Sequence, residues 1–238
     1  MRILWMYLTY FLMIAINAFA NILPLNGMTT GDISNQFPVL FTPSGYVFTI
    51  WSLIYLALLI WLIAITIQRQ RLTRPIASCF ITTNLLNSLW IIVWHFEWVG
   101  TSILVMVLLL IMLMLFYRAE RQMAQNSYIW IAPLSLYIGW ITVALLANIS
   151  YFFHAIGQPN FLGIGEVIWA LFFLFLGFCL GLFVRYQKKD ILYPLVIVWA
   201  FVGIFVRDQA TSEIVAVSAL VLAILLFLLN WFRLRKTA

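Results

Sequence analysis

The stretch TSILVMVLLLIMLMLFY, residues 101–117, decides the fold class of this chain of 238 residues. It carries no charge, and an uninterrupted apolar run of this length is typical of a helix that crosses a membrane. Hydrophobic residues make up 66% of the whole chain and charged residues only 8%, whereas a soluble domain has about 25% charged residues. The composition excludes a water-soluble globule, a disordered chain, collagen and a disulfide scaffold. It predicts an all-α, polytopic helical membrane protein.

Seven further apolar segments accompany this stretch, so about eight transmembrane helices are predicted in total. The predicted spans are 3–23, 45–67, 76–96, 101–117, 130–153, 164–185, 191–206 and 213–232. The seventh is at the lower limit of length for a spanning helix.

Basic residues fall in alternate loops. Twelve of the 13 Lys and Arg residues precede the first span or follow the second, fourth, sixth and eighth, and only Arg207 lies in the other loops. By the positive-inside rule this alternation predicts a multi-pass protein of the cell membrane with both termini in the cytoplasm. The net charge of +6 is therefore explained by topology and not by a nucleic-acid partner. An alternative concerns residues 1–20, because Arg2, an apolar stretch and Ala18-Phe19-Ala20 also resemble a secretory signal whose cleavage would leave seven spans.

Side chains typical of catalysis are scarce. Glu166 is expected in the first turn of its helix, and His95 is expected to be a hydrogen-bonded residue at the water boundary. Neither residue belongs to a Ser/His/Asp set, a carboxylate pair or a run of metal ligands. Cys79 and Cys179 lie in apolar runs and are expected to be buried free thiols. No metal site and no catalytic residue is therefore predicted.

Three predicted helices carry neutral amides and aromatic rings at helical spacing. Residues three or four apart share a helix face, and an Asn in hydrocarbon needs a partner, so these faces must point into the bundle. Two interpretations stay open: the amides join the helices by hydrogen bonds, or they line an aromatic cavity for a flat apolar ligand. The residues are Trp51 and Tyr55 in the second span, Asn84, Asn87 and Trp90 in the third, and Tyr137, Trp140, Ala144 and Asn148 in the fifth.

At these residues the chain resembles the TspO/MBR family, the tryptophan-rich sensory proteins and mitochondrial translocator proteins that include the peripheral-type benzodiazepine receptor. The resemblance covers about residues 1–153. The segments that carry it are FTPSGYVFTIWSLIY (41–55), NLLNSLW (84–90) and PLSLYIGWITVALLAN (133–148).

The chain also departs from the family pattern. The loop before the second helix lacks the usual W-Y and K-P-x-W, Tyr46 stands where Trp is usual, and Thr49 stands where Pro is usual. The family's aromatic-plus-basic motif after the fifth helix is missing, which argues against sterol binding.

The resemblance implies a five-helix bundle over residues 1–153, and residues 154–238 then form a three-helix transmembrane extension. It implies a ligand pocket beneath loop 24–44, which would act as a lid. The implied ligand-binding residues are Pro43, Trp51, Tyr55, Asn84, Asn87, Trp90, Tyr137, Trp140, Ala144 and Asn148.

The function implied by the resemblance is that of a sensor or carrier for tetrapyrrole-like or similar flat apolar molecules. No cofactor is required, and porphyrin or haem would bind as the ligand. The expected partners are membrane lipid, a hydrophobic small molecule and a second copy of the chain, with no nucleic acid. The alternative is a small-molecule permease or an accessory subunit of a membrane complex. An enzyme is not expected, because nothing resembles a general base or a metal site.

Overall fold

A computed structural model describes residues 1–22, 25–123 and 128–232. Residue 23 of the first predicted span, residue 24 of the predicted lid and three of the predicted cytoplasmic basic residues, Arg233, Arg235 and Lys236, lie outside these ranges.

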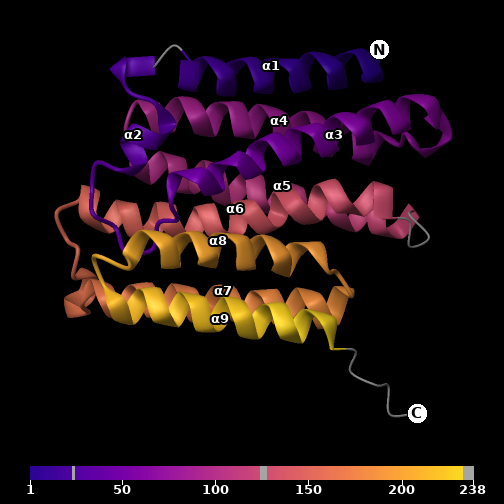
Figure 1. Cartoon of the computed structure of the whole chain (residues 1–238). Helices are drawn as coiled ribbons and strands as arrows, with labels where there is room; N and C mark the ends of the chain where they lie inside the picture. Colours follow the sequence, from indigo (N-terminus) through magenta and orange to yellow (C-terminus); the bar gives the residue numbers. More distant parts are fainter. Residues whose placement is uncertain (23–24, 124–127, 233–238) are drawn as a thin grey trace. The chain divides into compact units, whose positions relative to one another are not determined.

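The described residues form α-helices joined by short turns, and no β-strand occurs among them. The α-helices are α1 Arg2–Ile22, α2 Thr30–Ser34, α3 Ile50–Ile67, α4 Arg74–His95, α5 Val99–Met123, α6 Tyr128–Ala155, α7 Glu166–Lys188, α8 Leu192–Asp208 and α9 Glu213–Trp231 (Figure 1). The single-turn 3₁₀ segments are η1 Leu25–Gly27, η2 Gly45–Thr49, η3 Arg69–Arg71 and η4 Phe161–Gly163.

Seven of the described helices are long and apolar enough to cross a membrane; η2 and α3 form one of them, Gly45–Ile67. The remaining long helix, α8, has 17 residues, which is at the lower limit for a span. It coincides with the short seventh span predicted from the sequence. The prediction of a polytopic helical membrane protein is confirmed. The largest difference in bounds is at α5, which continues to Met123, six residues beyond its predicted end.

The chain divides into two compact units. The first contains residues 1–38 and 49–141, and the second contains residues 39–48 and 142–238. The division falls inside α6 and inside the loop between α2 and α3. The predicted lid 24–44 is therefore shared: its described part up to Pro38 belongs to the first unit, and 39–44 belongs to the second.

In the first unit α4 is the central helix and packs against both α1 and α5. Its start is set locally, because the Thr73 hydroxyl accepts the N–H of Ile76 and Pro75 occupies the first turn, as helix starts prefer. Towards that end of α4, the ring of Trp61 stacks on Phe80 and meets Phe116 edge-on, with both centroids 5.1 Å away. This aromatic cluster joins α3, α4 and α5.

A charged pair closes the same end of the first unit. Glu120 is fully buried, and its carboxylate lies 3.5 Å from the Arg71 guanidinium. Arg71 also donates to the Met123 carbonyl and lies 4.2 Å from the ring centre of Trp130. Glu120 continues the buried stripe of α5 through Leu109, Leu113 and Phe116, so its position on the buried face follows from helical spacing.

In the second unit α7, α8 and α9 pack pairwise. Two glycines of α7 face the neighbouring helices. A Cβ atom on Gly177 would lie 3.0 Å from the Phe201 ring, and one on Gly181 would lie 2.9 Å from a Leu226 methyl group. These glycines therefore allow α8 and α9 to approach α7 closely.

His95, at the end of α4, is fully buried and hydrogen-bonded, with its ring enclosed between α4 and α1. One sequence expectation needs correction. Cys79 is a buried free thiol as expected, but Cys179 is free and only half-buried.

Candidate ligand-binding site

An aromatic cluster centred on Trp51 lies at the start of α3 in the first unit. The indole of Trp51 stacks on Tyr55 at 5.4 Å and lies 6.4 Å from Trp90, nearly parallel to it. It meets Tyr137 and Trp140 edge-on, at 5.7 and 6.2 Å. Trp51 itself is half-buried, whereas Trp90, Tyr137 and Trp140 are buried. The structure therefore brings together five of the predicted aromatic residues from α3, α4 and α6.

A chain of side-chain hydrogen bonds runs beside this cluster. The Asn17 amide of α1 donates to the Asn87 oxygen at 2.8 Å, and the Asn87 amide donates to the Tyr137 hydroxyl at 2.8 Å. Both functional groups of Asn87 are thus satisfied by protein. This amide joins α1, α4 and α6, as the first interpretation expects, and the ligand-binding role of Asn87 stays a prediction.

Asn84 and Trp90 behave differently. The Asn84 amide donates only a long bond to the Thr9 hydroxyl, at 3.5 Å. Its oxygen and the Trp90 indole N–H are buried without a partner in the described part of the chain. A buried acceptor or donor left unpaired costs about 1–3 kcal/mol. One acceptor and one donor on α4 are therefore buried and unpaired among the described residues.

Three predicted residues belong to the second unit. Pro43 lies in segment 39–48 and packs near Gly203. Ala144 is half-buried in the later part of α6, and Asn148 is buried there. The cluster around Trp51 therefore draws on predicted residues of the first unit.

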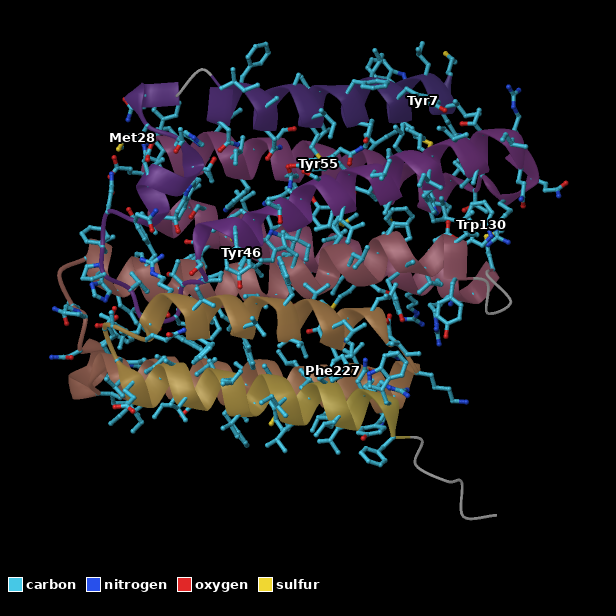
Figure 2. All side chains as sticks on the ribbon, viewed as in Figure 1. Tyr7, Met28, Tyr46, Tyr55, Trp130 and Phe227 are labelled. Carbon is cyan, nitrogen blue, oxygen red and sulfur yellow. The ribbon has the colours of Figure 1, made fainter. Side chains whose placement is uncertain are left out.

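The sequence did not single out the contribution of α1 to the site. The Tyr10 hydroxyl donates to the Tyr55 carbonyl at 2.9 Å, and Figure 2 shows Tyr55 on α3 and Tyr7 on α1, the two helices that this bond joins. Thr9 contacts Asn84, and Asn17 contacts Asn87. The sequence did contain a signal for this contribution. Thr9, Tyr10 and Asn17 recur at helical spacing on the buried face of α1, which also carries Met6, Met13 and Ala20.

Metal ligands do not gather in either unit: the described residues contain no group of three or more His, Cys, Asp or Glu side chains placed to hold a metal ion. The ring nitrogens of His95 lie 2.8 Å from the Ile91 carbonyl and 3.2 Å from the Ala20 carbonyl. Both nitrogens therefore face main-chain oxygens inside the protein, and a neutral ring, which has a single N–H, donates to only one of them.

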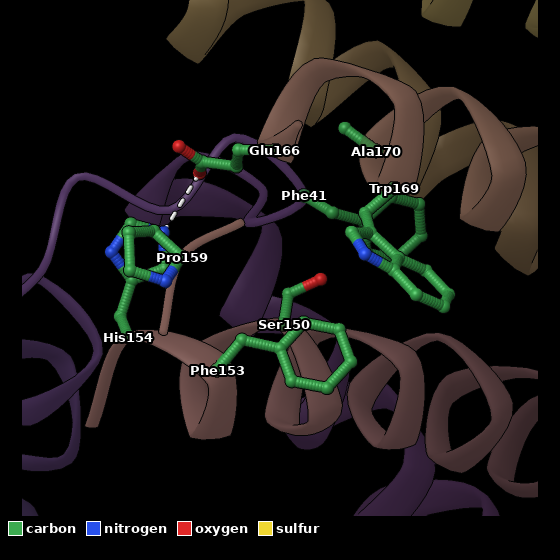
Figure 3. A pocket seen from close by; sticks show the side chains of 8 residues that line it. All are labelled: Phe41, Ser150, Phe153, His154, Pro159, Glu166, Trp169 and Ala170. Atoms are coloured by element: carbon green, nitrogen blue, oxygen red, sulfur yellow. Dashed lines mark ion pairs between the residues drawn. The ribbon is translucent and has the colours of Figure 1, made fainter. Parts of the chain in front are cut away.

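A separate small pocket lies in the second unit, where His154 and Glu166 pair at 3.0 Å (Figure 3). It has about 10 Å³ of space for the centre of a water molecule, enough for one water. This volume is too small for a porphyrin. The pocket is lined by Phe41, Ser150, Phe153, His154, Pro159, Glu166, Trp169 and Ala170.

Comparison with known proteins gives one match to a family. The model of that family, described as TSPO-like protein, matches residues 3–232. The chain belongs to the TSPO-like family. The match continues through α7, α8 and α9, beyond the region 1–153 over which the sequence motifs indicated the resemblance. No curated protein and no solved structure matches the chain.

Membership of the TSPO-like family agrees with the apolar helices: this is a multi-pass membrane protein of the TspO type. The family model covers most of both units, so the second unit is part of the matched region.

Proposed function

We propose that this TSPO-like protein binds a flat, largely apolar tetrapyrrole, of the porphyrin type, at the aromatic cluster around Trp51. The observation that carries this proposal is the contact of one half-buried indole with four further rings from three helices. Aromatic rings prefer offset-stacked and edge-on contacts. A planar macrocycle that entered the cluster would therefore exchange contacts between these side-chain rings for similar contacts between the rings and the macrocycle. The unpaired Asn84 oxygen and Trp90 N–H would supply the polar contacts.

The donor set favours a ligand without an axial bond to protein. The ring nitrogens of His95 face the main-chain carbonyls of Ile91 and Ala20, and His154 pairs with Glu166 in the second unit. The proposed ligand is therefore a metal-free porphyrin, or a haem held by ring contacts alone. We propose binding, as a sensor or carrier, and not catalysis. The partners would be membrane lipid, the hydrophobic ligand and a second copy of the chain.

The test is titration of the purified protein with protoporphyrin, followed by the porphyrin absorbance so that the loss of a Trp does not disturb the signal. Trp51→Ala and Trp140→Ala should each weaken binding about tenfold or more, because each removes a large stacking surface. Trp98→Ala is the matched control, since Trp98 is 62% exposed in the same unit and should leave affinity unchanged. Unaltered affinity in both site variants, with helicity intact, would exclude this cluster as the binding site.

Placement in the cell membrane with both termini cytoplasmic is also part of the proposal. It is supported by the basic residues that lie between α3 and α4, at the end of α5 and between α7 and α8. Labelling of single engineered cysteines with a membrane-impermeant reagent checks it; reaction from outside at a site between α7 and α8 would contradict it.

A further inference from the structure

The short segment Val39–Phe48 is fastened to the second unit through its own backbone. The Leu40 N–H donates to the Glu166 carboxylate at 2.9 Å. The Ser44 N–H donates to the Gly203 carbonyl at 3.1 Å. The indole N–H of Trp199 donates to the Val47 carbonyl at 3.1 Å. Because these three bonded groups of the segment belong to the main chain, this attachment fixes its path and not only its side chains.

One face of helix α8 contacts the segment through Trp199 and Gly203. Trp199 and Gly203 are four residues apart and share a helix face. A Cβ atom on Gly203 would overlap the side chain of Val47 and lie 3.1 Å from the Pro43 Cβ. Next to them the ring of Tyr46, which Figure 2 labels, meets Trp199 edge-on at 5.3 Å. This face of α8 thus binds the segment through the Trp199 N–H and the Gly203 carbonyl. Val47 and Pro43 fill the space that the missing side chain of Gly203 leaves.

The segment leads directly into the helix that carries Trp51 and Tyr55. Gly45–Ile67 is one continuous helical stretch, and Val47 precedes Trp51 by four residues, about one helical turn. A change in the path at Val47 therefore reaches Trp51 through the covalent chain, along one helical turn.

We propose that Glu166, Trp199 and Gly203 are positioning residues for ligand binding: α7 and α8 hold segment 39–48, and this sets the orientation in which α3 presents Trp51 and Tyr55. The inference rests on the proposed function for its effect on ligand affinity. It assigns a role to α7 and α8, which follow the five helices that carry the sequence motifs. The three residues touch the segment and not the ligand, so they act through α3.

Trp199→Phe is the sharpest test, because it keeps an aromatic ring and removes the N–H donor. The matched control for the smaller ring is Trp169→Phe, which removes an indole hydrogen bond of the same length, 3.1 Å, to the Phe161 carbonyl in the same unit. Hydrogen exchange by mass spectrometry on the full chain should show faster exchange in Trp199→Phe at residues 40–47 and also at 49–55. Trp169→Phe should leave residues 49–55 as in the wild type.

Protoporphyrin titration is the second measurement. Trp199→Phe should weaken binding about threefold to tenfold, as expected when a buried carbonyl loses its donor, whereas Trp169→Phe should not. Gly203→Ala should act in the same direction and more strongly, and Gly177→Ala, which presses on Phe201 instead, is its control. Glu166→Gln keeps an acceptor for the Leu40 N–H and should have the smallest effect.

The two measurements separate the two proposals. If Trp199→Phe and Gly203→Ala accelerate exchange at 40–47 but leave 49–55 unchanged, the positioning proposal is overturned, whether or not porphyrin binds. Faster exchange in both regions with unaltered porphyrin affinity overturns it as well. If the wild type binds no protoporphyrin while exchange in both regions responds to Trp199→Phe, the proposed function fails, and the hold of α8 on segment 39–48 with its effect on residues 49–55 stands.

Discussion

The two units of this protein join their helices by different means. In the first unit, side-chain hydrogen bonds cross between helices, as in the run from Asn17 through Asn87 to Tyr137. In the second unit, Gly177 and Gly181 let neighbouring side chains approach the backbone of α7. Both are established ways to associate helices where lipid and protein are equally apolar.

The difference concerns what each kind of contact demands. Close contact through glycines leaves little space for a Cβ atom at Gly177 or Gly181. Hydrogen bonding through amides requires a partner for each donor and acceptor, and the buried Asn84 oxygen of the first unit has none in the described part of the chain. One buried oxygen each of Asp208 and Asn230 in the second unit lacks a partner too, so unpaired polar atoms alone do not distinguish the two units.

The largest expected effect comes from filling a glycine contact. Gly181→Leu should destabilise the second unit by about 1–3 kcal/mol, since even a Cβ atom there approaches Leu226 to 2.9 Å and overpacking costs this much. Unfolding in increasing SDS, followed by circular dichroism, measures it. Gly165→Leu is the control, because nothing lies within 4 Å of a Cβ atom at Gly165. Equal stability of the two variants would show that close packing at α7 is not what holds this unit.

A smaller effect is expected from the amide chain of the first unit. In a double-mutant cycle, Asn17→Ala and Asn87→Ala should show a coupling energy of about 1 kcal/mol, within the range for hydrogen bonds between membrane helices. The matched pair in the second unit is Tyr193 and Thr142, whose hydroxyls lie 3.2 Å apart. A larger coupling for Tyr193→Phe with Thr142→Val than for the amide pair would reverse the comparison between the units.

The smallest effect is local and depends on pH. Hydrogen bonds from the Thr29 backbone N–H, and then from its hydroxyl, hold the pKa of Asp32 below its ordinary value. A carboxylate with a lowered pKa stabilises the folded state above its unfolded pKa, and this contribution is lost as pH falls through the folded value. Acidification below about pH 4, or Asp32→Asn, should therefore loosen α2. Amide exchange at residues 29–36 measures this, and release of segment 39–48 in Asp32→Asn at neutral pH would contradict the separate attachment of the two parts of the loop.

The sequence predicted the helices well, because each long apolar run needs internal backbone hydrogen bonds in a membrane. Even the short helix α8 was expected. The end of α5 was misjudged because Arg118 and Arg121 looked like the start of a loop, whereas Glu120 keeps the helical spacing of the buried face up to Met123. Charged residues near a helix end can stay helical when one of them is paired, as Glu120 is with Arg71.

The candidate site was predicted in part. The helical spacing of polar and aromatic residues was enough to place Trp51, Trp90 and Tyr137 on helix faces that point into the bundle. Contacts between distant segments were not predictable from spacing, since neither the bond from Asn17 to Asn87 nor the hold of Trp199 on Val47 leaves a local pattern. Gly203 looked like any small residue in an apolar run, and only the fold shows why a side chain has no room there.

The stacked indoles of the first unit have an optical consequence. Trp51, Trp90 and Trp94 form a row with nearly parallel rings and centroid spacings of 6.4 and 6.2 Å. At such spacings, electronic excitation passes between neighbouring chromophores before emission, so light absorbed by one ring is shared along the row. An energy acceptor bound next to Trp51 would therefore quench the fluorescence of all three indoles. The loss of tryptophan emission would then be larger than expected from quenching of Trp51 alone.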